Sequence, residues 1–75
     1  MHRLRKASGK ETIQALKQLG FRQIRQRGSH VVLKKSTASG DIGCVVPLHK
    51  ELKVGTLQGI LRQAKVKPED FMGNL

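Results

Sequence analysis

The sequence predicts an α+β domain in the order α-β-β-β-α, with a three-stranded antiparallel sheet covered by helices on one face. Three observations lead to this prediction. An apolar stripe with helical spacing stands near each end of the chain, short apolar segments lie between the two stripes, and short loops join those segments. Short loops favour an antiparallel meander, because parallel strands need long crossover connections. A chain of 75 residues has room for one such core.

The first helix is expected over about residues 9–19. Ser8 and Glu11 have the spacing of a capping box, in which each side chain accepts a hydrogen bond from the backbone N–H of the other residue. Gly20 is placed to end the helix in a left-handed conformation. The apolar stripe of this helix consists of Ile13, Ala15, Leu16 and Leu19.

A hairpin is expected next. A strand over residues 21–26 includes Ile24, and its imperfect alternation of apolar and polar residues indicates a bulge. A tight turn follows at Arg27-Gly28, where glycine supplies the positive φ that a short hairpin needs. The second strand covers residues 30–35.

A third strand and the C-terminal helices complete the domain. The composition of residues 36–40 predicts a loop, and residues 42–46 predict a strand that Pro47 stops, because proline has no N–H to donate. A helix is expected over about residues 55–65, and Pro68 begins a last helical turn. The stripe of the longer helix, at i, i+3, i+4 and i+7, consists of Leu57, Ile60, Leu61 and Ala64. Together these elements have the architecture of double-stranded-RNA-binding domains.

Most of the net charge of +10 lies in the first half of the chain. Residues 1–35 hold ten Lys or Arg and one acidic residue, whereas residues 36–75 hold five and four. This concentration predicts a polyanionic partner. Nucleic acid is favoured over membrane, because the basic residues lie on expected strands and turns rather than on one amphipathic helix. Residues 1–7 are expected to form a flexible basic arm, and residues 8–75 a single domain.

Cysteine usage and hydropathy exclude several classes of protein. Cys44 is the only cysteine, which excludes an internal disulfide and a cysteine-based zinc site, and we expect it to be a small buried hydrophobic residue. The histidines lack metal-site spacing too, so neither a metal nor a cofactor is expected. The longest apolar runs are a few residues, so we expect no membrane span, no signal peptide and a cytoplasmic location.

The segment Gly28-Ser29-His30 points most directly to a chemistry. RNA cleavage without a metal needs a base for the ribose 2′-hydroxyl proton, an acid for the leaving 5′-oxygen and positive charge near the phosphorane. His30 can serve as base or acid, because histidine changes its protonation near neutral pH. The alternative is a histidine that is hydrogen-bonded at a turn. The residues expected to bind RNA around it are Arg22, Arg25, Arg27, Ser29, Lys34 and Lys35.

His49 follows Pro47 and is a candidate for the second half of an acid–base pair. The alternative, an exposed loop histidine, is favoured because polar residues in loops are commonly exposed. His2 stands in the basic arm and is assigned no role. The chain has no Tyr or Trp on which bases could stack, so little base specificity is expected.

Seven short stretches match one known family in order and spacing. They are Leu19-Gly20-Phe21, Arg25-Gln26-Arg27-Gly28-Ser29-His30, Val46-Pro47-Leu48-His49, Glu51-Leu52-Lys53, Gly55-Thr56-Leu57, Ile60-Leu61-Arg62-Gln63-Ala64 and Glu69-Asp70-Phe71. On these residues the chain resembles the HicA (YcfA-like) toxins of bacterial HicAB toxin–antitoxin systems over nearly all of residues 8–72. Two features differ: Val54 stands where the family often has proline, and the stretch between Pro47 and Glu51 is shorter than in relatives.

The resemblance implies an endoribonuclease toxin (an mRNA interferase) with a double-stranded-RNA-binding-like fold. It implies that His30 is the catalytic histidine, that mRNA is the substrate and that a HicB-type antitoxin protein covers the site. No small-molecule cofactor is expected. One alternative is a non-catalytic RNA-binding module of the same fold. Another is a DNA-binding regulator, which has less support because no helix-turn-helix recognition helix is found.

Overall fold

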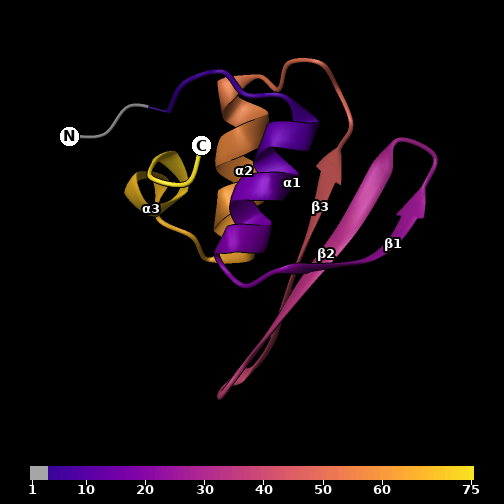
Figure 1. Ribbon diagram of the computed structural model, residues 1–75, viewed down its shortest axis with the longest axis vertical. Helices are drawn as coiled ribbons and strands as arrows, with labels where there is room; N and C mark the ends of the chain where they lie inside the picture. Colours follow the sequence, from indigo (N-terminus) through magenta and orange to yellow (C-terminus); the bar gives the residue numbers. More distant parts are fainter. Residues whose placement is uncertain (1–3) are drawn as a thin grey trace.

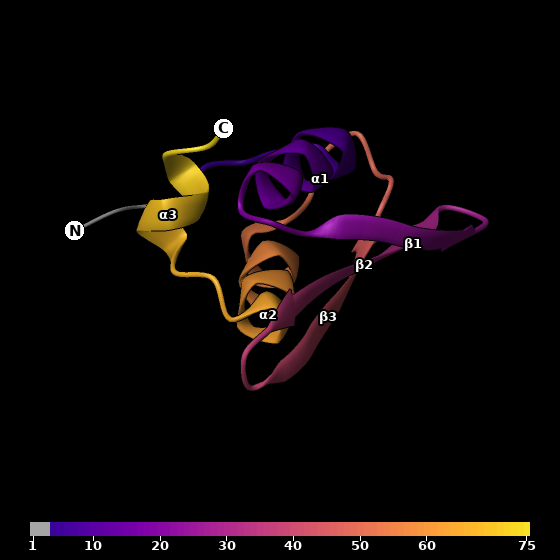
Figure 2. The ribbon, with the colours of Figure 1, turned by 60° about the horizontal axis from the view of Figure 1, so that its bottom comes forward.

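The computed structural model describes residues 4–75 of the chain. Its elements are α1 (Gly9–Gln18), β1 (Arg22–Arg27), β2 (His30–Thr37), β3 (Gly40–Pro47), α2 (Val54–Ala64) and α3 (Pro68–Met72). The predicted order of helix, three strands and helix is confirmed, and the predicted last turn is α3. Figures 1 and 2 show α1 and α2 on one side of the sheet, with α3 far from β1.

The predicted capping box starts α1. The Ser8 Oγ accepts a hydrogen bond from the Glu11 N–H at 3.0 Å, and a Glu11 carboxylate oxygen accepts one from the Ser8 N–H at 2.9 Å. The bond from the Ser8 backbone is the main cause that lowers the pKa of Glu11. Beyond the helix, Gly20 has the predicted left-handed conformation, with a φ of +101°, so the chain turns back toward the sheet.

The three strands form an antiparallel sheet in the order β1-β2-β3. The first hairpin closes at the pair Arg27 and His30, so its turn consists of Gly28 and Ser29, one residue later than predicted. Gly28 has a φ of +55°. A positive φ at the first central position is what a type II′ turn requires, and its twist matches that of the flanking strands.

The predicted bulge lies in β1. The register shifts between Gln23 and Arg25, which leaves Ile24 as the extra residue. Every residue of β1 is exposed, and Ile24 is 45% exposed. Phe21, just before the strand, is buried in the core. β1 is an edge strand that lies mostly outside the core, and Phe21 anchors its N-terminal end there.

The second hairpin is longer than predicted. β2 and β3 stay paired out to Thr37 and Gly40, so the turn is Ala38-Ser39 and the predicted loop over residues 36–40 is wrong. Two local features extend the ladder: Gly40 has a φ of +121°, and the Thr37 hydroxyl donates to the Gly40 carbonyl oxygen at 2.6 Å. Figure 1 shows the tip of this hairpin projecting past the helices, where small polar residues meet solvent.

The core lies between the helices and the inward face of β2 and β3. Val31 and Leu33 of β2 are buried there, beside their partners Val46 and Cys44 of β3. As predicted, Cys44 is buried, and this burial raises the pKa of its thiol to about 11. The rest of the core consists of Ala7, Ile13, Ala15, Leu16, Phe21, Leu52, Leu57, Ile60, Leu61, Ala64 and Phe71.

The core reaches back into the segment predicted to be a flexible arm. Ala7 is 2% exposed and forms an isolated bridge with Leu52, whose N–H donates to the Ala7 carbonyl oxygen at 2.7 Å. Leu4 packs against the core as well. Leu4 and Ala7 therefore belong to the packed domain. The first three residues of the predicted arm, among them His2, lie outside the described part of the chain.

Helix α2 ends on a residue with unusual backbone geometry. It lies one residue earlier than the predicted range 55–65, and its C-terminal cap is Lys65, with a φ of +55°. Among residues 4–75, Lys65 is the only residue other than glycine with a positive φ. Its N–H donates to the Arg62 carbonyl oxygen at 3.2 Å, and the Val66 N–H donates to that of Leu61 at 3.0 Å. These bonds satisfy the end of the helix, although a Cβ makes this conformation costly.

Candidate active site and nucleic-acid interface

His30 lies on the outer face of the sheet, directly after the turn of the first hairpin. The register pairs it with Arg27 on β1 and with Pro47 on β3. Directly paired residues of antiparallel strands point to the same face, and successive residues point to opposite faces. Because the next residue, Val31, is buried on the helix side, His30 and its two partners face away from the helices. His30 is exposed there.

The bulge in β1 brings three arginines onto this outer face. Arg25 pairs with Val32 and Arg22 with Lys34, and both partners alternate with buried residues of β2. Arg22 and Arg25 are three positions apart, and in a regular strand without a bulge they would point to opposite faces. We name the outward set the basic sheet face; it consists of Arg22, Arg25, Arg27, His30 and Lys34.

The basic sheet face has little compensating negative charge. The Lys34 Nζ lies 3.9 Å from a carboxylate oxygen of Asp41, in an exposed ion pair of a kind that adds little stability. The other ion pair found within residues 4–75 joins Lys6 and Glu51. Neither pair includes the three arginines, so their charge is available to a polyanion.

Lys35 lies on the other side of the sheet. It follows Lys34 in β2 and pairs with Ile42, which packs against the core. Its Nζ lies 5.9 Å from the centre of the Phe21 ring, a cation–π contact. Lys35 is one of the residues expected to bind RNA, but it lies on the opposite face of the sheet from Lys34 and the three arginines.

Two backbone hydrogen bonds fix the segment after β3, one to the turn of the first hairpin and one to the start of α1. The Leu48 N–H donates to the Ser29 carbonyl oxygen at 2.6 Å, and the Gly9 N–H donates to the His49 carbonyl oxygen at 2.9 Å. The first turn of α1 approaches so closely that a Cβ on Gly9 would collide with the Pro47 carbonyl oxygen. The backbone on both sides of His30 is therefore fixed, and Ser29 helps to fix it through its carbonyl group.

His49 lines a different hollow. This hollow has a volume of about 250 Å³ and is lined by Ser8, Lys10, Leu48, His49 and Lys50. None of these residues belongs to the basic sheet face. The two histidines are linked through the backbone hydrogen bond between Leu48 and Ser29 and do not share a surface hollow. An acid–base role for His49 stays a prediction.

Sequence reasoning missed an apolar strip in the middle of the basic sheet face. Val32 and Val45 pair across β2 and β3 on the outer face, and Val45 is 40% exposed. Arg25 continues this row on β1. A ribose or base can pack on the valines while the arginine meets a phosphate. The sequence of β2 contained the signal: Val31 and Leu33 point to the core, so the apolar Val32 between them must point outward.

The described part of the chain, residues 4–75, has neither a cluster of metal ligands nor a helix that could cross a membrane. No group of three or more His, Cys, Asp or Glu side chains is placed to hold a metal ion. No helix in this part is long and apolar enough to span a bilayer. The groups that the basic sheet face does present are an imidazole, three guanidinium groups and an amino group.

The family model for the HicA toxin of bacterial toxin–antitoxin matches residues 9–66, from the first turn of α1 to just beyond α2. The chain belongs to the HicA toxin family. The matched region contains both hairpins, the whole basic sheet face and the segment with His49. A comparison with curated proteins finds no match.

Membership in the HicA family makes this chain a toxin of the toxin–antitoxin type, and it implies an antitoxin as partner. The α-β-β-β-α order and the open three-stranded sheet agree with a double-stranded-RNA-binding-like fold. Helix α3 lies beyond the matched residues and adds Phe71 to the core.

Proposed function

We propose that this HicA-family toxin is an endoribonuclease that cleaves mRNA on the basic sheet face, by metal-independent acid–base catalysis at His30. The observation that supports this most is the direct pairing of His30 with Arg27. Opposed residues of an antiparallel pair have Cβ atoms about 5 Å apart. An imidazole and a guanidinium placed in this way can reach the same phosphodiester group.

The proposed reaction is an internal transfer at phosphorus. Neutral His30 takes the proton of a ribose 2′-hydroxyl, the 2′-oxygen attacks the adjacent phosphorus, and the bond from phosphorus to the 5′-oxygen breaks. Arg27 stabilises the negative charge that develops on the phosphorane oxygens. The leaving 5′-oxygen takes a proton from water or from His49. The products are a 2′,3′-cyclic phosphate and a 5′-hydroxyl end.

The remaining cations of the basic sheet face hold the RNA. Arg22, Arg25 and Lys34 are exposed and can bind phosphates on either side of the cleaved bond. We propose that a HicB-type antitoxin neutralises the toxin by covering this face with acidic or substrate-mimicking groups. Positive charge without nearby carboxylates on β1 supports both parts of the proposal.

The test compares the wild-type protein with His30→Ala on a labelled, structured mRNA in the presence of EDTA. His30 is exposed, so the variant should keep the thermal unfolding profile of the wild type. We expect cleavage by the wild type and none by His30→Ala. The variant His49→Ala, in the neighbouring hollow, tests whether His49 or water gives the proton to the leaving 5′-oxygen. Undiminished cleavage by a folded His30→Ala contradicts the proposal. Salt-sensitive binding without cleavage by either protein favours the non-catalytic RNA-binding module.

A further inference from the structure

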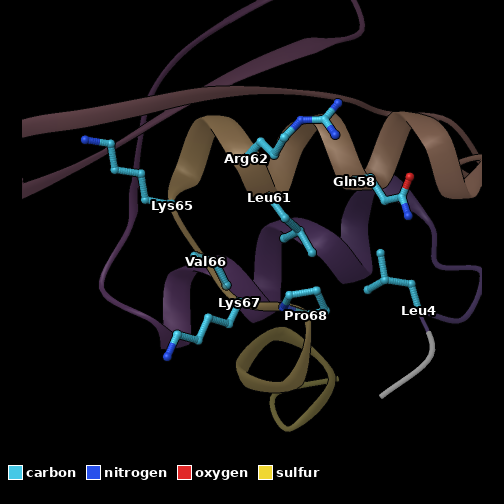
Figure 3. A pocket seen from close by; sticks show the side chains of 8 residues that line it. All are labelled: Leu4, Gln58, Leu61, Arg62, Lys65, Val66, Lys67 and Pro68. Atoms are coloured by element: carbon cyan, nitrogen blue, oxygen red, sulfur yellow. The ribbon is translucent and has the colours of Figure 1, made fainter. Parts of the chain in front are cut away.

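A groove on the helical side of the molecule has no part in the proposed reaction. It has a volume of about 460 Å³ and lies where the C-terminal half of α2 meets the start of α3 and the segment of Leu4. Figure 3 shows it from close by, and Figure 2 shows α3 at the opposite end of the molecule from β1. No lining residue belongs to the basic sheet face.

The floor of the groove is apolar. The side chains of Leu4, Leu61 and Pro68 point toward its centre in Figure 3, with Val66 beside them. Leu61 also belongs to the core, so this part of the floor is rigid. Pockets that hold small ligands have volumes of about 300–1,000 Å³, and the groove falls within that range. The groove is therefore large enough for more than one apolar side chain.

The rim of the groove is basic. Arg62, Lys65 and Lys67 line it, and Figure 3 shows their charged ends at its periphery. Neither ion pair found within residues 4–75 includes any of the three. The acidic residues nearest in the sequence, Glu69 and Asp70, lie in the first turn of α3 and do not line the groove. An occupant that brings carboxylates would meet uncompensated positive charge.

The backbone at Lys65 is a second observation about this rim. Its φ of +55° is a conformation in which glycine is the ordinary residue. A left-handed residue commonly ends a helix, and at Lys65 it does so for α2. Because a lysine and not a glycine stands at this cap, the end of the helix also places a cation at the rim.

We propose that this groove binds an acidic amphipathic helix of a partner protein. Apolar side chains on one face of that helix enter the groove, and carboxylates on its flanks meet Arg62, Lys65 and Lys67. The proposal goes beyond the proposed function, because the partner would hold the toxin without touching His30. RNA on the basic sheet face and the helix in the groove can be bound at the same time.

The first experiment uses a fluorescein-labelled peptide with leucine at i, i+3, i+4 and i+7 and glutamate at the other positions. It is titrated with the full chain and followed by fluorescence polarisation. We expect binding that weakens about tenfold when the same residues are scrambled, because the apolar face is then lost. A peptide with lysine in place of glutamate should not bind. Equal binding of the ordered and scrambled peptides, or no binding of either, overturns the proposal.

The second experiment locates the binding on the molecule. The double variant Arg62→Glu/Lys65→Glu should weaken the peptide about tenfold and leave RNA cleavage unchanged. Its matched control, Arg22→Glu/Arg25→Glu, changes the same charge on the basic sheet face and should lose RNA but keep the peptide. Equal loss of the peptide in both variants means general attraction between charges and overturns the proposal.

Two further outcomes separate the occupants and the two proposals. If the protein alone forms dimers that Val66→Asp abolishes, a second copy fills the groove and the proposal of a partner helix is wrong. Val66 is half-buried beside the groove, so the fold of this variant is checked by its thermal unfolding. Absence of RNA cleavage in the wild type contradicts the proposed ribonuclease and leaves the peptide result unaffected.

Discussion

Arg27 and His30 are the directly opposed residues that close the first hairpin of this HicA-family toxin. They share the outer face of the sheet, and only the turn of Gly28 and Ser29 separates them along the chain. Their spacing is therefore set by one tight turn and not by the packing of distant elements. Substitutions of Arg27 and His30 should therefore change RNA cleavage strongly and the stability of the fold little.

Replacing Arg27 with alanine should lower the rate of RNA cleavage by about 10²–10³, the cost of losing one charge-stabilising donor in a transition state. Arg27→Lys keeps the charge but not the forked geometry, so its rate should fall between the two. Arg27 is exposed, and thermal unfolding should hardly change. The measurement is single-turnover cleavage at saturating RNA, with Lys17→Ala on the exposed side of α1 as control. An unchanged rate in Arg27→Ala would falsify the assigned role.

Arg25 and Lys35 provide a matched pair for RNA binding, because they lie on opposite faces of the sheet. Removal of a cation that contacts phosphate lowers the slope of log K against log salt by about 0.7 for a single strand. We expect this reduction in Arg25→Ala and not in Lys35→Ala, measured by RNA binding over a range of salt concentrations. Equal reductions in the two variants would place Lys35 in the interface and contradict the assignment of faces.

Gly9 is the position where α1 touches the end of β3, so Gly9→Ala should be destabilising. The added Cβ has no room beside the Pro47 carbonyl oxygen, and overpacking of this kind costs about 1–3 kcal/mol. The control is Gly59→Ala in α2, where a Cβ meets no atom within 4 Å and the change should stabilise the helix by about 0.5–1 kcal/mol. Urea unfolding measures both. Similar shifts of the same sign would show that the contact at Gly9 is not close.

Glu11 should make stability depend on pH in the acid range. Its pKa is lowered in the folded protein, so its ionised form favours folding. This contribution is present above the ordinary value of 4.5 and is lost as the pH falls through the lowered pKa of the folded state. Thermal unfolding of the wild type and Glu11→Gln should therefore differ near neutral pH and converge in acid. A difference that stays constant from pH 7 to pH 3 contradicts this account.

Local signals in the sequence predicted the helices well. The capping box depends on two residues three positions apart, Ser8 and Glu11, and no distant contact is needed to form it. The stripe that includes Leu57 and Ile60 is likewise local, and both residues are buried. The turn at Ala38-Ser39 was missed because small polar residues resemble a loop when a hairpin extends past the core into solvent.

The five residues of the basic sheet face were all named from the sequence, but their arrangement was not. The motif that ends in His30 was visible in the sequence, whereas the face on which each cation lies depends on strand register. The imperfect alternation of β1 indicated a bulge, but six residues are too few to show that Ile24 is the extra residue, and this position decides whether Arg22 joins Arg25. Lys34 and Lys35 look equivalent in the sequence, and only the pairing with β1 and β3 separates them.

The arginines of β1 have another consequence, because β1 is an edge strand. Free N–H and C=O groups along such an edge invite a strand from another molecule, and natural sheets prevent this with charged side chains and bulges. β1 has both. The side chains proposed to attract RNA also oppose the pairing of two copies of this protein through the β1 edge. A variant stripped of them loses both properties together, and it can precipitate although its core is intact.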